Sequence, residues 1–342
     1  MTTAYCFDEL FLKHSYPGHP ENADRLSAIM SHLNECGLLE QLAFREPQPA
    51  TEDQIARLHS PSYIDRVRLL SERGGGHLDP DTYTNSYSFA AAMLAAGALI
   101  TITRAVLADD ARNGFALIRP PGHHALPARG MGFCIFNNVA IAALEALHCP
   151  GVERVLIYDF DVHHGNGTQD AFEEDPRVLF FSTHQYPHYP GTGAAGETGI
   201  GDGAGTVVNI PLPPGIGDAG YAKVMAEVAW PLAQRYHPDL ILVSAGFDAH
   251  WSDPLAMMAL SLNGYATIGR ELVTMAEEFC DGKIVFTLEG GYDRTVLAYG
   301  VENTFHALLG DGTISDPVGP APFEERPVEN RIAEIKRIHR LA

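Results

Sequence analysis

The sequence predicts an α/β protein with a central, mostly parallel sheet flanked by helices. Short apolar runs rich in β-branched residues recur along the chain, and the segments between them are long enough to hold helices. Each run is followed at once by polar or ionisable residues, and in such sheets sites form beyond the carboxyl ends of the strands. The four clearest runs are residues 115–118, 155–158, 240–243 and 284–288.

A long apolar stretch, residues 90–107, precedes the first of these runs and is rich in alanine. Gly97, Thr101, Thr103 and Arg104 interrupt it. A bilayer span needs about 20 predominantly apolar residues, so we expect a buried helix here rather than a membrane span.

The run at residues 115–118 leads into Arg-Pro-Pro-Gly-His-His at residues 119–124. A histidine pair by itself is more often a surface or capping feature than a catalytic one. Its place at the end of a predicted strand gives it more weight.

The run at residues 155–158 is followed by two aspartates and two histidines within six residues. On an extended chain alternate side chains share a face, so Asp159, Asp161 and His163 are expected to point the same way. Mixed oxygen and nitrogen ligands suit Zn²⁺, and a carboxylate-rich set with an open position is typical of a catalytic site. The alternative is a salt-bridged or capping cluster at a strand end.

The last two runs end in Ser-Ala-Gly-Phe-Asp at residues 244–248 and in Glu-Gly-Gly-Tyr at residues 289–292. The Gly-Gly pair taken alone could be a simple turn. Because four strand ends carry His, Asp or Tyr at corresponding places, we expect these residues to meet in one crevice.

Two further segments have weaker signals. The glycine-rich stretch 191–205 lacks the Lys-Ser/Thr pair of a phosphate loop, so it is expected to form a long loop at the rim of the crevice, with an ordinary surface loop as the alternative. The tail from residue 326 to 342 is locally basic and helix-prone, and we expect it to pack on the body or on another subunit.

Composition indicates one folded domain over residues 1–342, with a core of about residues 1–312 and a C-terminal extension over 313–342. Hydrophobic residues make up 46% of the chain and charged residues 19%, which excludes a disordered protein. Five cysteines without a CxxC spacing indicate reduced thiols. Residues 1–6 lack a basic start followed by an apolar signal core, which favours a cytoplasmic location.

The formal net charge of −20 argues against general nucleic-acid binding, which requires a basic face. It is compatible with cationic substrates through long-range attraction, although acidic proteins are common for reasons of solubility.

Together these motifs resemble the zinc-dependent histone deacetylase superfamily, which includes class II enzymes, bacterial histone deacetylase-like amidohydrolases and acetylpolyamine amidohydrolases. The similarity runs from His19-Pro20-Glu21-Asn22 to Gly310-Asp311 in the expected order. The resemblance implies a single catalytic domain with the arginase/deacetylase-like fold and its active site at the carboxyl ends of the strands.

The resemblance also implies the catalytic groups. The zinc ligands would be Asp161, His163 and Asp248. The remaining catalytic residues would be the tandem histidines, the carboxylate and amide that orient them, and the transition-state tyrosine: His123, His124, Asp159, Asn166 and Tyr292. Asn166 stands where some members carry Asp, so a neutral partner is expected to leave His124 less basic.

For the substrate, the resemblance implies an acyl-lysine tunnel walled by Phe133 and Tyr189, where the second wall is usually Phe. Asp81 aligns less securely with a rim residue, and an ordinary turn is the alternative. The other substrate-binding positions implied are Gly132, Leu255, Gly290 and Gly291. Arg25 resembles the arginine of an internal acetate channel; the alternative is a salt bridge that ties the first helix to the body.

Two potassium sites are implied in the same way. The inner one involves Asp159, Asp161, His163, Ser182 and Thr183. The outer one involves Phe172, Asp175, Val178 and Thr206.

The expected function is a deacetylase with one catalytic Zn²⁺ per chain that hydrolyses acetylated lysine-type amides to amine and acetate. The alternatives are an acetylpolyamine or small-molecule amidohydrolase, and a non-catalytic acyl-lysine-binding protein. Dedicated polyamine enzymes carry Glu in a Gly-Asp-Pro-Glu context, whereas this chain reads Ser252-Asp253-Pro254-Leu255. Related bacterial enzymes self-associate, so a homo-oligomer, dimer or tetramer, is expected. Neither a membrane nor nucleic acid is expected as a partner.

Overall fold

The computed structural model describes residues 2–342 and contains an eight-stranded sheet in which every recorded strand pair is parallel. The predicted fold class is therefore confirmed. From edge to edge the strands are β2 (Ala43–Phe44), β1 (Thr3–Cys6), β5 (Asn113–Ala116), β10 (Ile284–Leu288), β9 (Leu240–Ala245), β6 (Val155–Asp159), β7 (Val178–Gln185) and β8 (Val207–Leu212). A separate antiparallel hairpin, β3 (Gly75–Asp79) and β4 (Thr82–Asn85), lies beside α4 (Pro61–Glu72).

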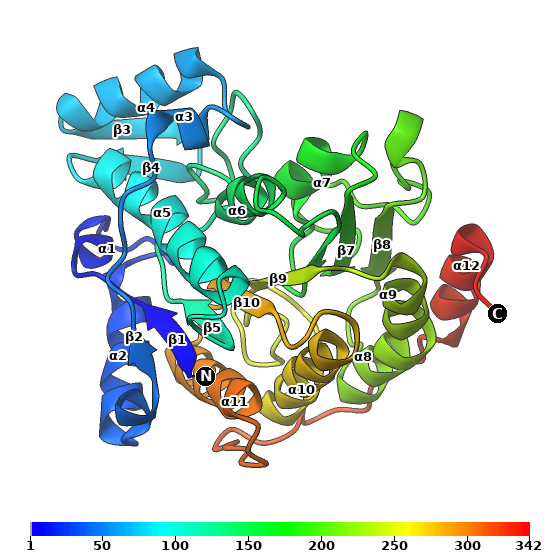
Figure 1. The fold of residues 1–342 in the computed structure, drawn as a ribbon. Helices are drawn as coiled ribbons and strands as arrows, with labels where there is room; N and C mark the ends of the chain where they lie inside the picture. Colours follow the sequence, from blue (N-terminus) through cyan, green and yellow to red (C-terminus); the bar gives the residue numbers. More distant parts are fainter. Residues whose placement is uncertain (1) are drawn as a thin grey trace.

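Helices cover both faces of the sheet (Figure 1). One group is α5 (Ser88–Leu107), α6 (Asn138–Ala146) and α7 (Asn166–Phe172). The other comprises α2 (Ala23–Glu35), α8 (Asp218–Val224), α9 (Trp230–Tyr236), α10 (Leu262–Phe279) and α11 (Arg294–Leu309), with a π-helical turn at Met225–Ala229 joining α8 to α9. Peripheral helices are α1 (Leu10–Lys13), α3 (Glu52–Ile55), α4 (Pro61–Glu72) and α12 (Glu329–His339).

Local sequence determines where several helices begin. Asn22, Ser60 and Ser261 each accept a backbone N–H at the first turn of their helix, and Pro61 occupies the first helical position after Ser60. Asp293 does the same for α11, where it accepts from the amides of residues 295 and 296. This last cap directly follows the predicted Glu-Gly-Gly-Tyr motif, so it helps to define the end of the crevice.

The strand register brings the functional segments to one edge. Asp159, the last residue of β6, lies opposite Ser182 of β7 and Ser244 of β9. Leu288, the last residue of β10, lies opposite Ala245. The three chain segments that follow β6, β9 and β10 therefore leave the sheet side by side, as the sequence pattern required.

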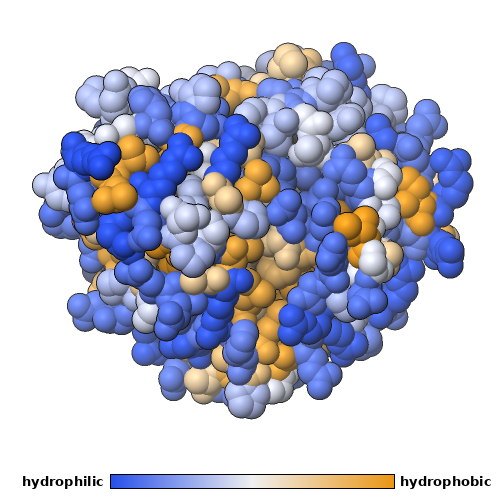
Figure 2. Space-filling view, turned by 90° about the horizontal axis from the view of Figure 1, so that it is seen from above, coloured by the Kyte–Doolittle hydropathy of each residue, from blue (hydrophilic) through white to orange (hydrophobic). Residues whose placement is uncertain are grey.

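Helix α5 is a core helix, as predicted. It is long and apolar enough to cross a bilayer, yet 72% of its most apolar window is buried inside the protein. It packs against β5, β1 and α6. The face shown in Figure 2 is mostly hydrophilic, with apolar residues in small groups and in one strip along a central hollow.

The structure also shows where the C-terminal tail and the glycine-rich loop 191–205 lie. α12 packs against the edge strand β8 and the π-helical turn, which agrees with the expectation that the tail lies on the body. The loop 191–205 was expected to form the crevice rim, but among the described residues none of this loop lines the cavity. Instead Thr192 Oγ1 lies 2.8 Å from His164 Nδ1, and Gly193 O lies 2.8 Å from His184 Nε2. The loop therefore packs on these two buried histidines.

Candidate active site

A cavity lies where these strand ends meet. Its walls come from the segments after β5, β6, β9 and β10 and from the loops that carry Phe133 and Tyr189. The predicted residues that line it are Asp81, His123, His124, Gly132, Phe133, Asp161, His163, Tyr189, Leu255, Gly290 and Tyr292. Pro121 and Cys134 also line it and were not singled out from the sequence.

Asp161, His163 and Asp248 form a tight group at the cavity floor. His163 Nδ1 lies 3.1 Å from Asp161 Oδ1 and 3.3 Å from Asp248 Oδ2. Both carboxylates are buried, and Asp248 Oδ2 accepts no hydrogen bond among the described residues. An unpartnered buried carboxylate oxygen is costly unless a cation neutralises it. The donor set therefore fits a divalent metal ion.

The charges in this group lead to the same conclusion. Burial alone would lower the pKa of His163, but the Asp161 and Asp248 carboxylates raise it to about 10. The pKa of Asp248 is raised by burial and by the neighbouring Asp161 charge. Two acidic groups this close require a positive charge between them, and in the protein alone the imidazolium of His163 supplies it.

Glycines allow these carboxylates to approach the backbone. A Cβ at Gly290 would lie 2.2 Å from Asp248 Oδ2, and one at Gly246 would lie 2.0 Å from Asp161 Oδ2. Gly290 N also donates to Asp161 Oδ2 at 2.8 Å. Any side chain at either position would displace a proposed metal ligand.

Asp159 does not join the metal-type group, contrary to the expectation that it would point with Asp161 and His163. β6 ends at Asp159, and the chain then turns, with Asp161 N donating to Asp159 Oδ1 at 3.1 Å. The alternation of an extended strand therefore ends before Asp161 and His163. Asp159 instead contacts His123, with Oδ2 2.9 Å from Nδ1. Asn166 takes the equivalent place on His124, with Oδ1 2.8 Å from Nδ1.

The tandem histidines differ in charge. Burial lowers the pKa of His123, but the Asp159 and Asp161 carboxylates outweigh it and raise the value to about 10. Burial, and then the positive charges of His123 and His163, hold the pKa of His124 well below its usual value. A cationic and a neutral imidazole thus lie side by side, with ring centroids 4.0 Å apart.

Tyr292 is held by Asp253 and Arg25. Its backbone N–H donates to Asp253 Oδ2 at 2.7 Å, and its ring lies 5.1 Å from the Arg25 guanidinium carbon. Arg25 also donates to Gly291 O at 2.7 Å and to Glu289 O at 2.6 Å. Burial keeps the pKa of the Tyr292 hydroxyl well above its usual value, so the hydroxyl remains a donor.

Arg25 itself belongs to a buried ion cluster. Glu21 lies between Arg25, 3.3 Å away, and Arg119, whose Nε and Nη2 both donate to the carboxylate. Arg25 thus makes the ion pair that the sequence left as an alternative. It does not line the cavity, so a role in acetate passage stays a prediction.

Sequence reasoning assigned no role to two buried carboxylates, Glu289 and Asp253. Glu289 Oε2 accepts from the backbone N–H groups of Gly122 at 2.7 Å and His123 at 3.3 Å, which places the first histidine. Asp253 accepts from the N–H groups of Tyr292 and Asp293. Glu289 begins the Glu-Gly-Gly-Tyr segment and Asp253 lies in Ser-Asp-Pro-Leu, but their backbone partners are distant in the sequence.

The tunnel above the floor has two aromatic walls. Gly132 and Phe133 both have positive φ, +56° and +70°, and Phe133 N donates to Thr82 Oγ1 at 3.0 Å. Positive φ at a bulky residue is strained, and such strain occurs most often at functional sites. The Tyr189 ring stands perpendicular to His124 with centroids 5.1 Å apart. The Tyr189 hydroxyl is buried without a hydrogen-bond partner among the described residues.

Asp81 and Leu255 both line the cavity, and their contact with substrate stays a prediction. His188 was not predicted: its ring stacks on His163 with centroids 5.1 Å apart, and its Nε2 lies 3.0 Å from Leu255 O. Its position next to Tyr189 is the only sequence signal that could have indicated it.

Comparison with known proteins agrees with this geometry. Residues 19–308 match the sequence model of the histone deacetylase domain family. This chain belongs to the histone deacetylase family. A probable deacetylase of Archaeoglobus fulgidus is 42% identical, over 99% of this chain and 98% of that protein. The chloroplastic histone deacetylase 14 of Arabidopsis thaliana is 41% identical, over 96% of this chain and 82% of that protein.

The fold of this histone deacetylase family member is also close to a solved one. The crystal structure of the HDA15 HD domain superposes with a TM-score of 0.90 at 36% identity, covering 98% of this chain and 96% of that chain. The predicted family and fold class are thus confirmed, and the chain has the deacetylase scaffold over nearly its full length.

Within this family fold, the predicted potassium residues cluster around β7. Thr183 Oγ1 lies 3.5 Å from Asp159 O, and Ser182 Oγ lies 2.9 Å from His184 Nδ1. At the outer position, Phe172 O accepts from Asp175 N at 3.0 Å and Thr206 O from Phe180 N at 2.9 Å. Potassium binding at either place stays a prediction.

Replacing Glu21 with Gln tests the buried ion cluster. Burial alone would raise the pKa of Glu21, but Arg119 lowers it from 4.5 to about 2. A lowered pKa stabilises the fold above pH 4.5 and the benefit disappears as the pH falls towards 2. We expect Glu21→Gln to lower the free energy of unfolding near neutral pH by about 3–5 kcal/mol, because two buried guanidinium groups lose their partner.

Urea unfolding at a series of pH values measures this effect. The difference between wild type and Glu21→Gln should shrink as the pH falls below 4.5. Glu40→Gln, at an exposed position, should match wild type throughout. A difference that stays constant with pH would contradict the assignment of charge to Glu21.

Proposed function

We propose that this protein is a zinc-dependent deacetylase that hydrolyses the amide of acetylated lysine-type amines to free amine and acetate. The observation that carries the proposal is a single cavity that combines a buried metal-type group, two adjacent histidines held by Asp159 and Asn166, and Tyr292. Hydrolysis of an amide requires an activated water, stabilisation of the oxyanion and a proton for the leaving amine, and these groups can supply each.

Asp161, His163 and Asp248 would hold the Zn²⁺. A zinc ion bound there would acidify a water molecule and polarise the substrate carbonyl. His163 Nδ1 lies 3.1 Å from Asp161 Oδ1 and 3.3 Å from Asp248 Oδ2, and this close grouping of donor atoms supports the assignment. Because Zn²⁺ would neutralise the two aspartates, it would also release His163 from the cationic form.

His124 is the proposed general base. Burial, followed by the charge of His123, lowers its pKa, so its ring is neutral and can accept a proton from water. Its contact with Asn166, a neutral amide, does not raise its basicity as a carboxylate would. His123, whose pKa the Asp159 carboxylate raises, is the proposed cationic partner that stabilises developing negative charge.

Tyr292 is the proposed oxyanion donor. Its hydroxyl lines the cavity and stays protonated, and Asp253 and Arg25 hold its backbone and ring. A non-catalytic acyl-lysine-binding protein would have no need for a tyrosine in this position or for the paired histidines. The intact set therefore favours the enzyme over that alternative.

The tunnel favours a substrate with a slender apolar stem. Phe133 and Tyr189 wall it, and a lysine side chain offers the methylene chain that fits between aromatic rings. The unpartnered Tyr189 hydroxyl could accept or donate a hydrogen bond to a polar group of the substrate. Leu255 at the rim has no charge for the distal ammonium of a polyamine. An acetylpolyamine or other small-molecule amide is the second candidate, favoured only by the net charge of −20.

Further features complete the proposal. We infer K⁺ at the two sites around β7, a cytoplasmic location and a dimeric or tetrameric assembly. Nucleic acid and membranes are not proposed as partners, since the chain is strongly acidic and its long apolar helix is mostly buried.

Asp248→Ala tests the metal ligands. We expect the variant to lose most of its catalytic zinc and nearly all deacetylase activity, because one of three ligands and its charge are removed. Elemental analysis and turnover of an acetyl-lysine peptide measure both. Asp53→Ala, at an exposed position, is the control and should keep zinc and activity. Full zinc occupancy in Asp248→Ala would refute the assignment.

Tyr292→Phe tests the oxyanion donor. The variant should fold and bind zinc normally but lose about 10²–10³ in kcat, the loss typical of one such donor. KM should change less, because the hydroxyl stabilises the transition state more than the bound substrate. Tyr87→Phe, which is 47% exposed, should behave as wild type. A kcat within about twofold of wild type would exclude Tyr292 from this role.

Leu255→Glu tests substrate choice. Wild type should have a higher kcat/KM for acetyl-lysine peptides than for acetylspermidine. A carboxylate at the rim would attract the second ammonium, so the ratio should shift towards the polyamine by a few-fold, the strength of a partly exposed ion pair. Leu255→Gln adds the same bulk without charge and should leave the ratio unchanged. A wild-type preference for acetylspermidine would overturn the lysine proposal.

A further inference from the structure

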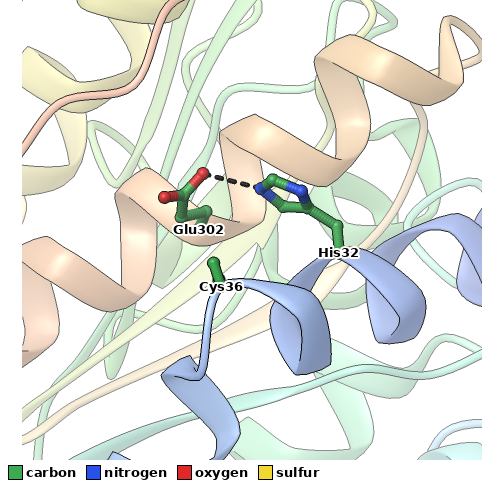
Figure 3. A group of neighbouring side chains, drawn as sticks. All are labelled: His32, Cys36 and Glu302. Atoms are coloured by element: carbon green, nitrogen blue, oxygen red, sulfur yellow. Dashed lines mark hydrogen bonds and ion pairs between the residues drawn. The ribbon is translucent and has the colours of Figure 1, made fainter.

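A second group of metal-type side chains lies between α2 and α11, outside the cavity. His32 lies in the last turn of α2 and Cys36 caps that helix, one turn further on, while Glu302 faces them from α11. Figure 3 shows the three side chains gathered between the two helices, with the contact from His32 to Glu302 drawn. His32 Nε2 lies 2.7 Å from Glu302 Oε2. One ligand atom of each residue lies within 4.8 Å of the other two.

We propose that His32, Cys36 and Glu302 bind a second Zn²⁺ ion, which clamps α2 to α11. Mixed imidazole, thiolate and carboxylate donors suit Zn²⁺, whereas Mg²⁺ and Ca²⁺ prefer oxygen alone. Tetrahedral zinc with bonds of about 2.0–2.3 Å places its ligand atoms roughly 3.3–3.8 Å apart. The present 4.8 Å spread therefore needs about 1 Å of side-chain movement. Cys36 is exposed, and its Sγ makes a long contact of 3.5 Å to Leu33 O that this movement would replace.

His306 adds a further imidazole beside Glu302. It lies one turn after Glu302 on α11, and its Nδ1 is 2.7 Å from Asp311 Oδ2. A histidine that donates its Nδ1 proton to a carboxylate presents a lone pair at Nε2, the usual arrangement of a metal-ligating histidine. That Nε2 lies 3.6 Å from Glu302 Oε1. A lone pair facing a carboxylate oxygen is unfavourable unless a cation or proton lies between them.

The surroundings favour a cation as well. His32 and Cys36 end α2 and His306 lies in the last turn of α11, so the negative ends of both helix dipoles are close. The Tyr299 ring packs 4.1 Å from the His32 ring and limits its rotation. Glu302 is only 8% exposed and also accepts a hydrogen bond from Ser315 Oγ at 3.0 Å.

The location gives the clamp a role. α2 carries Arg25, which contacts Gly291 and Tyr292, and α11 begins directly after Tyr292 at the Asp293 cap. His32 lies about two turns further along α2 than Arg25, some 10 Å away. An ion that joins these helices would stabilise the support of Tyr292 without taking part in the reaction.

Cobalt reconstitution of the full-length protein tests this site, and its thiolate-to-cobalt band does not depend on the proposed function. We expect the chelator-treated protein to bind two Co²⁺ per chain. A thiolate-to-cobalt absorption band should appear, because the first site, Asp161, His163 and Asp248, contains no sulfur. Cys36→Ser and His32→Ala should each lose one ion and the band, with an unchanged circular dichroism spectrum and unchanged deacetylase activity.

Two controls separate the sites. Cys149→Ser removes another partly exposed thiol, whose Sγ contacts Glu145 O, and should keep both ions and the band. Asp248→Ala should lose the first ion but keep the band. Wild-type protein that binds one ion without the band, or a band that persists in Cys36→Ser, would overturn the proposal.

Discussion

Two neighbouring carboxylates, Asp161 and Asp248, are buried at the end of a parallel sheet, and the structure around them is arranged to make that burial tolerable. A charged group without water must be hydrogen-bonded and neutralised. Backbone amides of Val162, His163 and Gly290 donate to these oxygens. One oxygen, Asp248 Oδ2, stays without a hydrogen bond among the described residues, which leaves a place for a metal ion.

The burial of these two carboxylates also explains the glycines beside them and the order of the central strands. Only glycine at positions 246 and 290 lets the chain pass within contact distance of the carboxylates. The central strands β6, β9 and β10 bring their carboxyl ends to one line, so donors from three distant segments reach the same group. The histidines come from the segment after β5, the next strand in the sheet.

A second layer holds the reacting groups. Glu289 and Asp253 accept backbone N–H groups of His123 and Tyr292, and the buried cluster of Glu21, Arg25 and Arg119 ties α2 to the segment before Tyr292. These residues do not line the cavity. Their contribution is to limit where a ring or hydroxyl can lie, which is a condition for stabilising a transition state.

The sequence by itself determined the fold class, the family and most of the cavity lining, because short apolar runs ending in His, Asp, Gly and Tyr are local signals. Only the tertiary structure decided which of these side chains contact one another. Asp159 turned to His123 because β6 ends there. Arg25 contacts Gly291 O and the Tyr292 ring because α2, although distant in sequence, packs beside the segment that carries Tyr292. Asp253, Glu289, His188 and the group of His32, Cys36 and Glu302 depend on contacts between segments far apart in sequence, which no local pattern encodes.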